Sequence, residues 1–224
     1  WLSREGVMAL LTYVPALVVG WGCLQGQSDE VLYRGAGLVL GLCALLTVFT
    51  TAMIYASLRS IDAWRLAPVP PLYLLLALAT GLVVFNALAA FSGASIRLTA
   101  SLAAGLLGAS ALIKRAYWRM LDTSPARSSA ESATGLGRFG TVSVLQQPHG
   151  RENYVMREMG FVIARKRAAR LHRITQVTLF VLPFVASMLA ASSSGPTAAL
   201  ASAIALLAVV PGVLTERWLF FAEA

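Results

Sequence analysis

The chain has 224 residues, of which 58% are hydrophobic and 12% charged, and its mean hydropathy is +0.72. A soluble domain carries about 25% charged residues, so a water-soluble core could not hide this much apolar surface. The net charge of +8 is concentrated in one segment, which favours a membrane protein with a basic loop over a nucleic-acid-binding protein. We therefore expect an all-α integral membrane bundle, because the alternating pattern of a membrane β-barrel is absent.

The first half of the chain predicts four membrane-spanning helices. Each apolar stretch is long enough to cross about 30 Å of hydrocarbon at 1.5 Å per residue. We expect no charged residue in the interior of a span, which argues against an ion-coupled pump or a voltage sensor. The predicted helices cover residues 6–24, 35–58, 71–91 and 95–113.

A polar segment of about 60 residues follows and contains 12 of the 18 Lys and Arg residues. Its first part, 124–140, is rich in Ser, Gly and Ala and is expected to be irregular. Its second part, 151–173, reads as an amphipathic basic helix that either contacts lipid headgroups or docks another subunit. Two further apolar stretches, 174–191 and 197–214, complete a prediction of about six transmembrane helices. The predicted organisation is 1–113 for the first four spans, 114–173 for the basic loop and 174–224 for the last two.

The placement of positive charges predicts the orientation. With six spans, sixteen of the eighteen Lys and Arg residues fall on one side, and Arg34 and Arg97 fall on the other. The excess of positive charge marks the cytoplasmic side, so we expect the long basic loop in the cytoplasm of a multi-pass plasma-membrane protein. The chain begins at Trp1 and ends directly after an apolar run, and both ends look cut.

The sequence contains few Cys and His residues that could bind a redox metal. Cys23 and Cys43 lie in apolar runs, and His149 and His172 lie in or beside the polar loop. Four thiolates for an iron–sulfur cluster and two facing histidines for haem are therefore not expected in this chain. Any such centre is expected in a partner subunit.

Candidate functional residues lie at helix ends. Glu5 precedes a long apolar run, where partial desolvation would suit a carboxylate to accept protons, although an acid is also favoured at any helix N-terminus. Glu216 and Arg217 are followed by further apolar residues and form either a buried pair or an interface marker. Arg4 and Arg217 are candidates to orient a ligand oxygen.

Three segments carry a resemblance to a known family. They are the Trp1–Glu5 segment, the run Met53–Leu58 with Ile61 and Trp64, and the closing run Glu216–Ala224. These resemble the dimethyl sulfoxide reductase membrane anchor (DmsC) family. Loop segments 130–137, 148–149, 153–154, 158–161 and 164–166 are similar to a branch of that family with an enlarged loop.

The resemblance implies an eight-helix anchor subunit, so this chain would lack the first two helices. It also implies a non-catalytic subunit of a DMSO reductase-like complex in bacterial anaerobic respiration. Menaquinol would be oxidised, and electrons would pass to an iron–sulfur partner and then to a molybdopterin catalytic subunit. The acid of the family's quinol site corresponds to Glu5, with Arg4, Glu216 and Arg217 as further candidates for quinol binding. A His-Leu-Gly segment that normally completes the site would precede Trp1.

Two other interpretations of the sequence remain open. A small-molecule transporter fits the number of spans but lacks charged residues at mid-membrane and an internal repeat. A purely structural membrane anchor would share every feature except a functional Glu5. In relatives with exported catalytic subunits the segment that corresponds to Glu5 faces outward, whereas the charge count places Glu5 inside.

Overall fold

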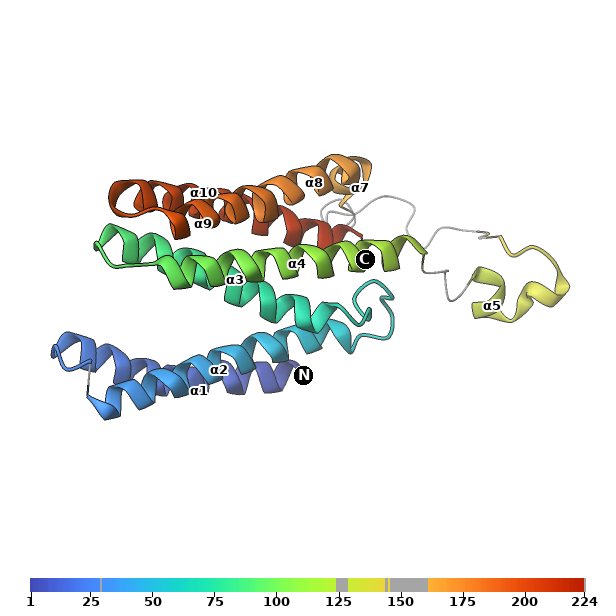
Figure 1. Ribbon diagram of the computed structural model, residues 1–224. Helices are drawn as coiled ribbons and strands as arrows, with labels where there is room; N and C mark the ends of the chain where they lie inside the picture. The colour runs from blue at the N-terminus through green and yellow to red at the C-terminus, as the bar shows by residue number, and fades with distance from the viewer. Residues whose placement is uncertain (29, 124–128, 144, 146–160, 224) are drawn as a thin grey trace.

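The computed structural model describes residues 1–28, 30–123, 129–143, 145 and 161–223. These residues form helices and contain no strand, which confirms the predicted all-α membrane bundle. The long helices run side by side, and both ends of the chain lie at the same end of the bundle (Figure 1). We call this the loop end. The long helices are α1 (Leu2–Leu24), α2 (Val31–Ala56), α3 (Val69–Phe91), α4 (Arg97–Thr123), α9 (Leu182–Ser192) and α10 (Gly195–Ala222).

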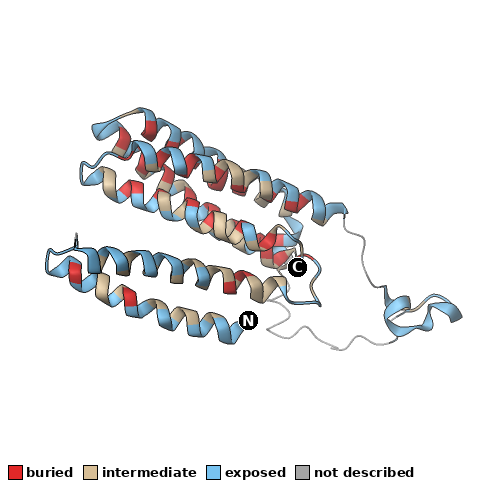
Figure 2. Cartoon of the chain, turned by 60° about the horizontal axis from the view of Figure 1, so that its bottom comes forward, coloured by how far each residue is buried: buried red, intermediate tan, exposed pale blue. Residues whose placement is uncertain are grey.

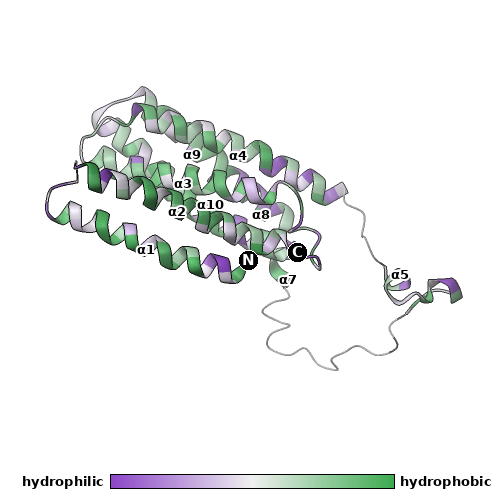
Figure 3. Ribbon diagram, turned by 90° about the horizontal axis from the view of Figure 1, so that it is seen from below, coloured by the Kyte–Doolittle hydropathy of each residue, from purple (hydrophilic) through white to green (hydrophobic). Residues whose placement is uncertain are grey.

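Five of the described helices are long and apolar enough to cross a membrane. They are α1, α2, α3, the continuous stretch Ala168–Ser192 and α10. The sixth long helix, α4, falls outside this group because Lys114, Arg115, Arg119 and Asp122 make its last third polar. It nevertheless packs between α3 and α9, within the bundle. Green, apolar residues dominate the long helices in Figure 3.

Helix ends follow local sequence signals. Two prolines, Pro70 and Pro71, open α3, where a missing backbone N–H costs nothing. Gly26 and Gly93 adopt positive φ values just after α1 and α3, a conformation that glycine reaches without steric cost. The last two spans are joined by a turn at Ser193 and Ser194, as the short predicted connection requires.

The structure differs from the sequence prediction at several helix ends. The fourth helix, expected to end near Ile113, continues to Thr123. The last helix, expected to reach at least Leu214, continues to Ala222. The bundle therefore contains Lys114, Glu216 and Arg217. Glu216 and Arg217 follow the buried-pair alternative of the sequence analysis, whereas Lys114 was expected in the loop. Paired charges tolerate this position because each has an opposite charge beside it.

The predicted irregular segment 124–140 also differs. Residues 124–128 lie outside the described part. The rest of the segment contains two short helices, α5 (Ala130–Thr134) and the 3-10 helix η1 (Leu136–Phe139). Ser129 and Ser132 cap α5 reciprocally, which makes even this short helix favourable. The first part of the predicted basic helix 151–173, residues 151–160, lies outside the described residues. Its last part forms α7 (Val162–Lys166) and α8 (Ala168–Thr175).

Helix α8 continues into the membrane through one π-helical segment, η2 (Gln176–Val181), and then α9. At this segment α10 comes very close, because a Cβ placed on Gly212 would lie 2.7 Å from the backbone N of Leu179. Gly212 is thus required for this helix contact.

Buried residues concentrate in the part of the bundle formed by α3, α4, α9 and α10 (Figure 2). The hairpin of α1 and α2 packs along this part through α2 and α3, and most of its own surface is exposed in the isolated chain. The central core is apolar and consists of small and medium side chains: Ala79, Val83, Ala103, Leu107, Ala186, Ala205 and Val209.

Candidate functional site

Glu5 lies in the first turn of α1 at the loop end, and its side chain is held by α2. The hydroxyl of Thr51 donates a hydrogen bond of 2.6 Å to Oε1 of Glu5. The same hydroxyl also lies 2.9 Å from the carbonyl oxygen of Thr47. Glu5 is the acidic residue of this first turn, near the positive end of the helix dipole. Glu5 is half-buried, so it is fixed in place but accessible.

A pocket of about 380 Å³ begins one turn deeper along the same helix faces. On α1, residues 5, 9, 12 and 16 share one face, and on α2 residues 44, 47 and 51 do so. The Glu5–Thr51 pair therefore stands at the loop end of the stripe that lines this pocket. Its lining residues are Ala9, Thr12, Tyr13, Ala16, Ala44 and Thr47.

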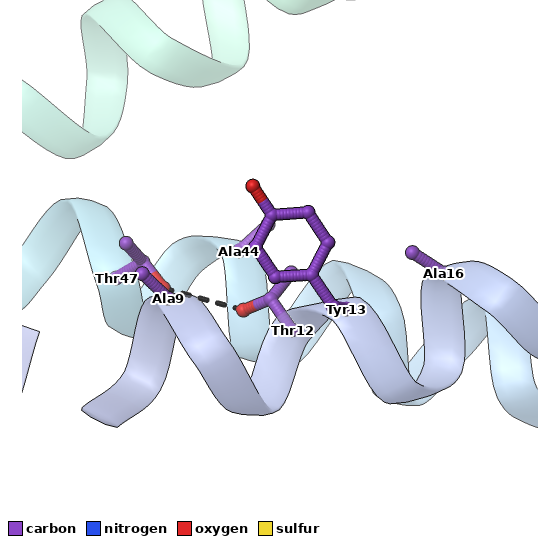
Figure 4. Close-up of a pocket in the computed structure, with 6 residues that line it drawn as sticks. All are labelled: Ala9, Thr12, Tyr13, Ala16, Ala44 and Thr47. Carbon is purple, nitrogen blue, oxygen red and sulfur yellow. Dashed lines mark hydrogen bonds between the residues drawn. The ribbon is translucent and has the colours of Figure 1, made fainter. Parts of the chain in front are cut away.

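The walls of this pocket combine small apolar groups with a few polar ones. The hydroxyls of Thr12 and Thr47 lie 3.4 Å apart, and the ring of Tyr13 stands beside them (Figure 4). Ala9, Ala16 and Ala44 are the small apolar residues of this lining. Predominantly apolar walls with a few placed polar groups are typical of small-molecule sites, and the volume lies in their usual range.

The Arg4 side chain lies on a different surface of the hairpin from the Glu5–Thr51 pair. Its guanidinium carbon lies 4.5 Å from the centre of the Trp1 ring, which in turn meets Phe49 edge-on at 6.1 Å. Arg4 and Trp1 line a separate apolar pocket of about 480 Å³ with Val7 and Met8. Two neighbouring pockets thus flank the start of α1, one on the Glu5 side and one on the Arg4 side.

Glu216 and Arg217 lie at the same end of the bundle but inside it. Oε1 of Glu216 accepts a 2.5 Å hydrogen bond from Nζ of Lys114, and Oε2 accepts one of 2.5 Å from Nε of Arg217. The side chains of Lys114 and Glu216 are 0% and 1% exposed, whereas that of Arg217 is 26% exposed. Both carboxylate oxygens of Glu216 are therefore occupied by the chain's own cations.

A cluster of aromatic rings lies between the α1–α2 hairpin, which carries Glu5, and the group formed by Glu216 and Arg217. Tyr55, at the end of α2, contacts Trp64, Tyr73, Phe220 and Phe221. The indole N–H of Trp64 donates a 2.9 Å hydrogen bond to the carbonyl oxygen of Phe220. These contacts join the α1–α2 hairpin to the end of α10.

Arg217 reaches this aromatic cluster, because its guanidinium carbon lies 4.3 Å from the ring centre of Tyr73. The four predicted site residues thus form two groups at one end of the bundle. Among the described contacts, none joins Glu5 or Arg4 directly to Glu216 or Arg217.

Sequence reasoning missed Lys114 and Thr51. Lys114 begins a polar run, which predicts a loop, but Ser110, Lys114, Tyr117 and Trp118 recur at the spacing of one buried helix face. Thr51 carried no signal, because threonine is common in membrane helices. Within the described residues, no group of three His, Cys, Asp or Glu side chains could hold a metal ion. His149 lies outside them.

Comparison with known proteins finds an informative relative. The C subunit of the sulfite dehydrogenase of Allochromatium vinosum is 30% identical over 240 aligned positions, which cover the whole chain and 71% of the relative. No family model matches the chain. No solved structure matches it either.

Proposed function

The chain belongs to the family of the sulfite dehydrogenase C subunit and is a membrane subunit of a redox enzyme complex, and from this premise we propose that it binds and oxidises menaquinol beside Glu5. This is the role that the resemblance to the DmsC anchors implies. The subunit supplies binding and a proton acceptor, and it contributes to an oxidoreductase without being its catalytic subunit. The redox centres belong to partner subunits.

The observation that carries the proposal is the position of the Glu5–Thr51 pair at the end of the α1–α2 pocket. A hydroquinone is a flat, largely apolar ring with two hydroxyl groups. The pocket offers alanine walls for the ring and a carboxylate near the membrane face for a hydroxyl. The groove opens along the surface of the hairpin, so an isoprenoid tail can extend from it into lipid.

The chemistry assigned to Glu5 is proton acceptance. Thr51 holds Oε1, and no described hydrogen bond occupies Oε2, which is the oxygen available to a quinol hydroxyl. Oxidation of one quinol to quinone releases two electrons and two protons. Glu5 accepts the protons in turn and releases them toward the loop end, while the electrons leave to an iron–sulfur cluster of the docked partner. A positioned base of this kind contributes typically about 10²–10⁴-fold to a proton-transfer step.

In this proposal Glu216 and Arg217 stabilise the structure beside the site and do not contact the quinol ring, because the carboxylate of Glu216 is enclosed by Lys114 and Arg217. Arg217 contacts Tyr73 and Phe220, which adjoin Tyr55 of the hairpin. Arg4 borders the neighbouring pocket, where its charge can attract an oxygen of the ligand.

The partners proposed are an iron–sulfur electron-transfer subunit and a molybdopterin catalytic subunit on the loop end of the bundle. Basic side chains are exposed there on two helices, with Arg115 and Arg119 on α4 and Arg170 and Arg173 on α8. We place this end on the cytoplasmic side of the bacterial plasma membrane, following the charge distribution.

The test is binding of a fluorescent quinol analogue, a hydroxyquinoline N-oxide, to membranes that contain the whole complex. Replacing Glu5 by Gln removes a charged hydrogen-bond acceptor, and we expect about tenfold weaker binding or more. Glu30→Gln is the matched control, because Glu30 is an exposed acid at the N-cap of α2, at the other end of the hairpin.

The outcomes separate the alternatives. Weaker binding in Glu5→Gln alone supports the quinol site. Equal binding in wild type and both variants removes Glu5 from it. An absence of binding in wild type favours the purely structural anchor.

A further inference from the structure

A second group of polar residues lies inside the loop-end half of the bundle, between α4, α8 and α10. Its members are Lys114, Tyr117 and Trp118 of α4, His172 and Thr175 of α8, and Glu216 and Glu223 at the end of α10. The proposed quinol chemistry uses none of these residues as a ligand to the substrate. Their arrangement has its own chemical consequence.

Four buried polar atoms in this group have no hydrogen-bond partner within the described part of the chain. They are Oη of Tyr117, Nε1 of Trp118, Oγ1 of Thr175 and Oε2 of Glu223. Native proteins satisfy nearly all buried polar groups, and where the protein itself offers no partner an ordered water supplies one. Together the four atoms offer three potential donors and one carboxylate oxygen, and a buried water needs two to four such partners.

The helix packing places these groups in consecutive layers. Helices α8 and α10 run antiparallel, with Gly212 against Leu179 and Glu223 against His172. One turn from Gly212 along α10 is Glu216, and one turn before Leu179 of η2 is Thr175, the last residue of α8. By this register Thr175 lies at about the level of Glu216, and the His172–Glu223 pair lies nearer the loop end.

The outer end of this group reaches the surface. His172 hydrogen-bonds to Oε1 of Glu223, and their side chains are 26% and 13% exposed. The His172 ring also stacks on Trp118 with ring centres 4.5 Å apart. Trp118 in turn lies 5.3 Å from the Lys114 ammonium, and Tyr117 lies 4.4 Å from it.

The inner end is closed. One turn deeper on α4, the Ser110 hydroxyl is bonded to the carbonyl oxygen of Leu106 at 2.7 Å. Beyond it lies the apolar core around Leu107 and Ala103. Any polar route through this group therefore leads from the loop end to Lys114 and stops there.

We infer that water occupies the contact between α4, α8 and α10 and connects the buried Lys114–Glu216 pair to the loop-end surface through Thr175 and the His172–Glu223 pair. The cluster is then a proton-exchange site with access from one side of the membrane only. A proton leaves the Lys114 ammonium to a neighbouring water and is replaced from the same water chain, so charge and atoms balance at each exchange. This inference does not depend on quinol binding.

The sequence provides a direct probe, because it contains two lysines, Lys114 and Lys166. The chain is labelled with ¹⁵N-lysine, reconstituted in lipid nanodiscs and transferred to D₂O, and the loss of the Nζ proton signals is followed by NMR. Lys166 is exposed, so its Nζ protons exchange at once and mark the completed transfer to D₂O in every sample.

Two variants interrupt the inferred water chain. Thr175→Val keeps the shape of the side chain and removes the buried hydroxyl, and Glu223→Gln keeps the size and removes the charge. Thr178→Val is the matched control, because the Thr178 hydroxyl is bonded to the carbonyl oxygen of Ile174 and lies outside the cluster.

We expect the Lys114 signal to exchange within minutes in wild type and in Thr178→Val. Thr175→Val should slow it by about tenfold or more, with Lys166 unchanged. Two results would overturn the inference: a wild-type Lys114 signal that persists for hours, which means a dry cluster, or wild-type exchange in both Thr175→Val and Glu223→Gln.

Discussion

Lys114 and Glu216 are 102 positions apart in the sequence and form a 2.5 Å ion pair between α4 and α10. Neither side chain is accessible to bulk solvent, with side-chain exposures of 0% and 1%. Removing two charges from water is costly, so such a pair persists only because each partner compensates the other. The two helices are therefore held in register near the loop end.

Replacing Lys114 alone should destabilise the bundle strongly. Lys114→Met leaves the Glu216 carboxylate buried with Arg217 as its remaining cation, and we expect a loss of about 3 kcal/mol in the free energy of unfolding. The measurement is denaturant unfolding in detergent micelles, followed by tryptophan fluorescence. Lys166→Met is the control, and an equal, small effect of both substitutions would contradict the role of the pair.

The double variant Lys114→Met with Glu216→Leu should be more stable than Lys114→Met alone, because it removes the unpaired charge along with its partner. Arg217 is partly exposed and can be solvated in this variant. If instead the two losses add, Lys114 and Glu216 do not stabilise each other.

Two helix backbones approach each other very closely at Gly212. An alanine there would place its Cβ 2.7 Å from the backbone N and 2.8 Å from the Cα of Leu179. We expect Gly212→Ala to lower the free energy of unfolding by about 1–3 kcal/mol, because the backbone must shift. Gly105→Ala has no atom within 4 Å of the new methyl group and should be neutral or slightly stabilising. Equal stability of the two variants would show that the helices can move apart at the Gly212–Leu179 contact with little loss of free energy.

Thr51 positions the carboxylate of Glu5, so its hydroxyl should matter for quinol binding. Thr51→Val removes the hydrogen bond, and we expect about tenfold weaker binding of the hydroxyquinoline N-oxide. Thr51→Ser keeps the hydroxyl and should restore most of the affinity. If Thr51→Val binds as wild type does, the Glu5–Thr51 bond has no part in the ligand site.

The placement of the two ends of the bundle can be tested with maleimide labelling in cells. Cys23 is exposed near the end of α1 that lies away from the loop end, and Ser60 is exposed in the connection between α2 and α3. In a Cys43→Ala background, the native Cys23 should react with an impermeant reagent added outside the cell. A Cys23→Ala, Ser60→Cys variant should react only after the cells are opened. The opposite pattern would place the loop end outside.

The sequence sufficed for the existence of the helices, because long apolar runs have few alternatives in a membrane. The sequence did not predict where the fourth helix ends. Lys114 looked like the start of a loop, and for Glu216 the sequence left a buried pair and an interface marker open. A single charge beside an apolar run gives no sign of a partner 102 residues away. Glu5 could be singled out from its position, but Thr51 became visible only when α1 and α2 were paired.

The π-helical segment Gln176–Val181 sets the rotation of everything that precedes it on its helix. A π-turn accommodates one more residue than an α-turn. Each residue of an α-helix accounts for about 100° of rotation. Deleting one residue here would convert the segment to a regular helix and turn His172 and Thr175 by about that angle, away from Trp118 and α10. The polar face of α8 is thus specified by the length of this segment as much as by its own side chains.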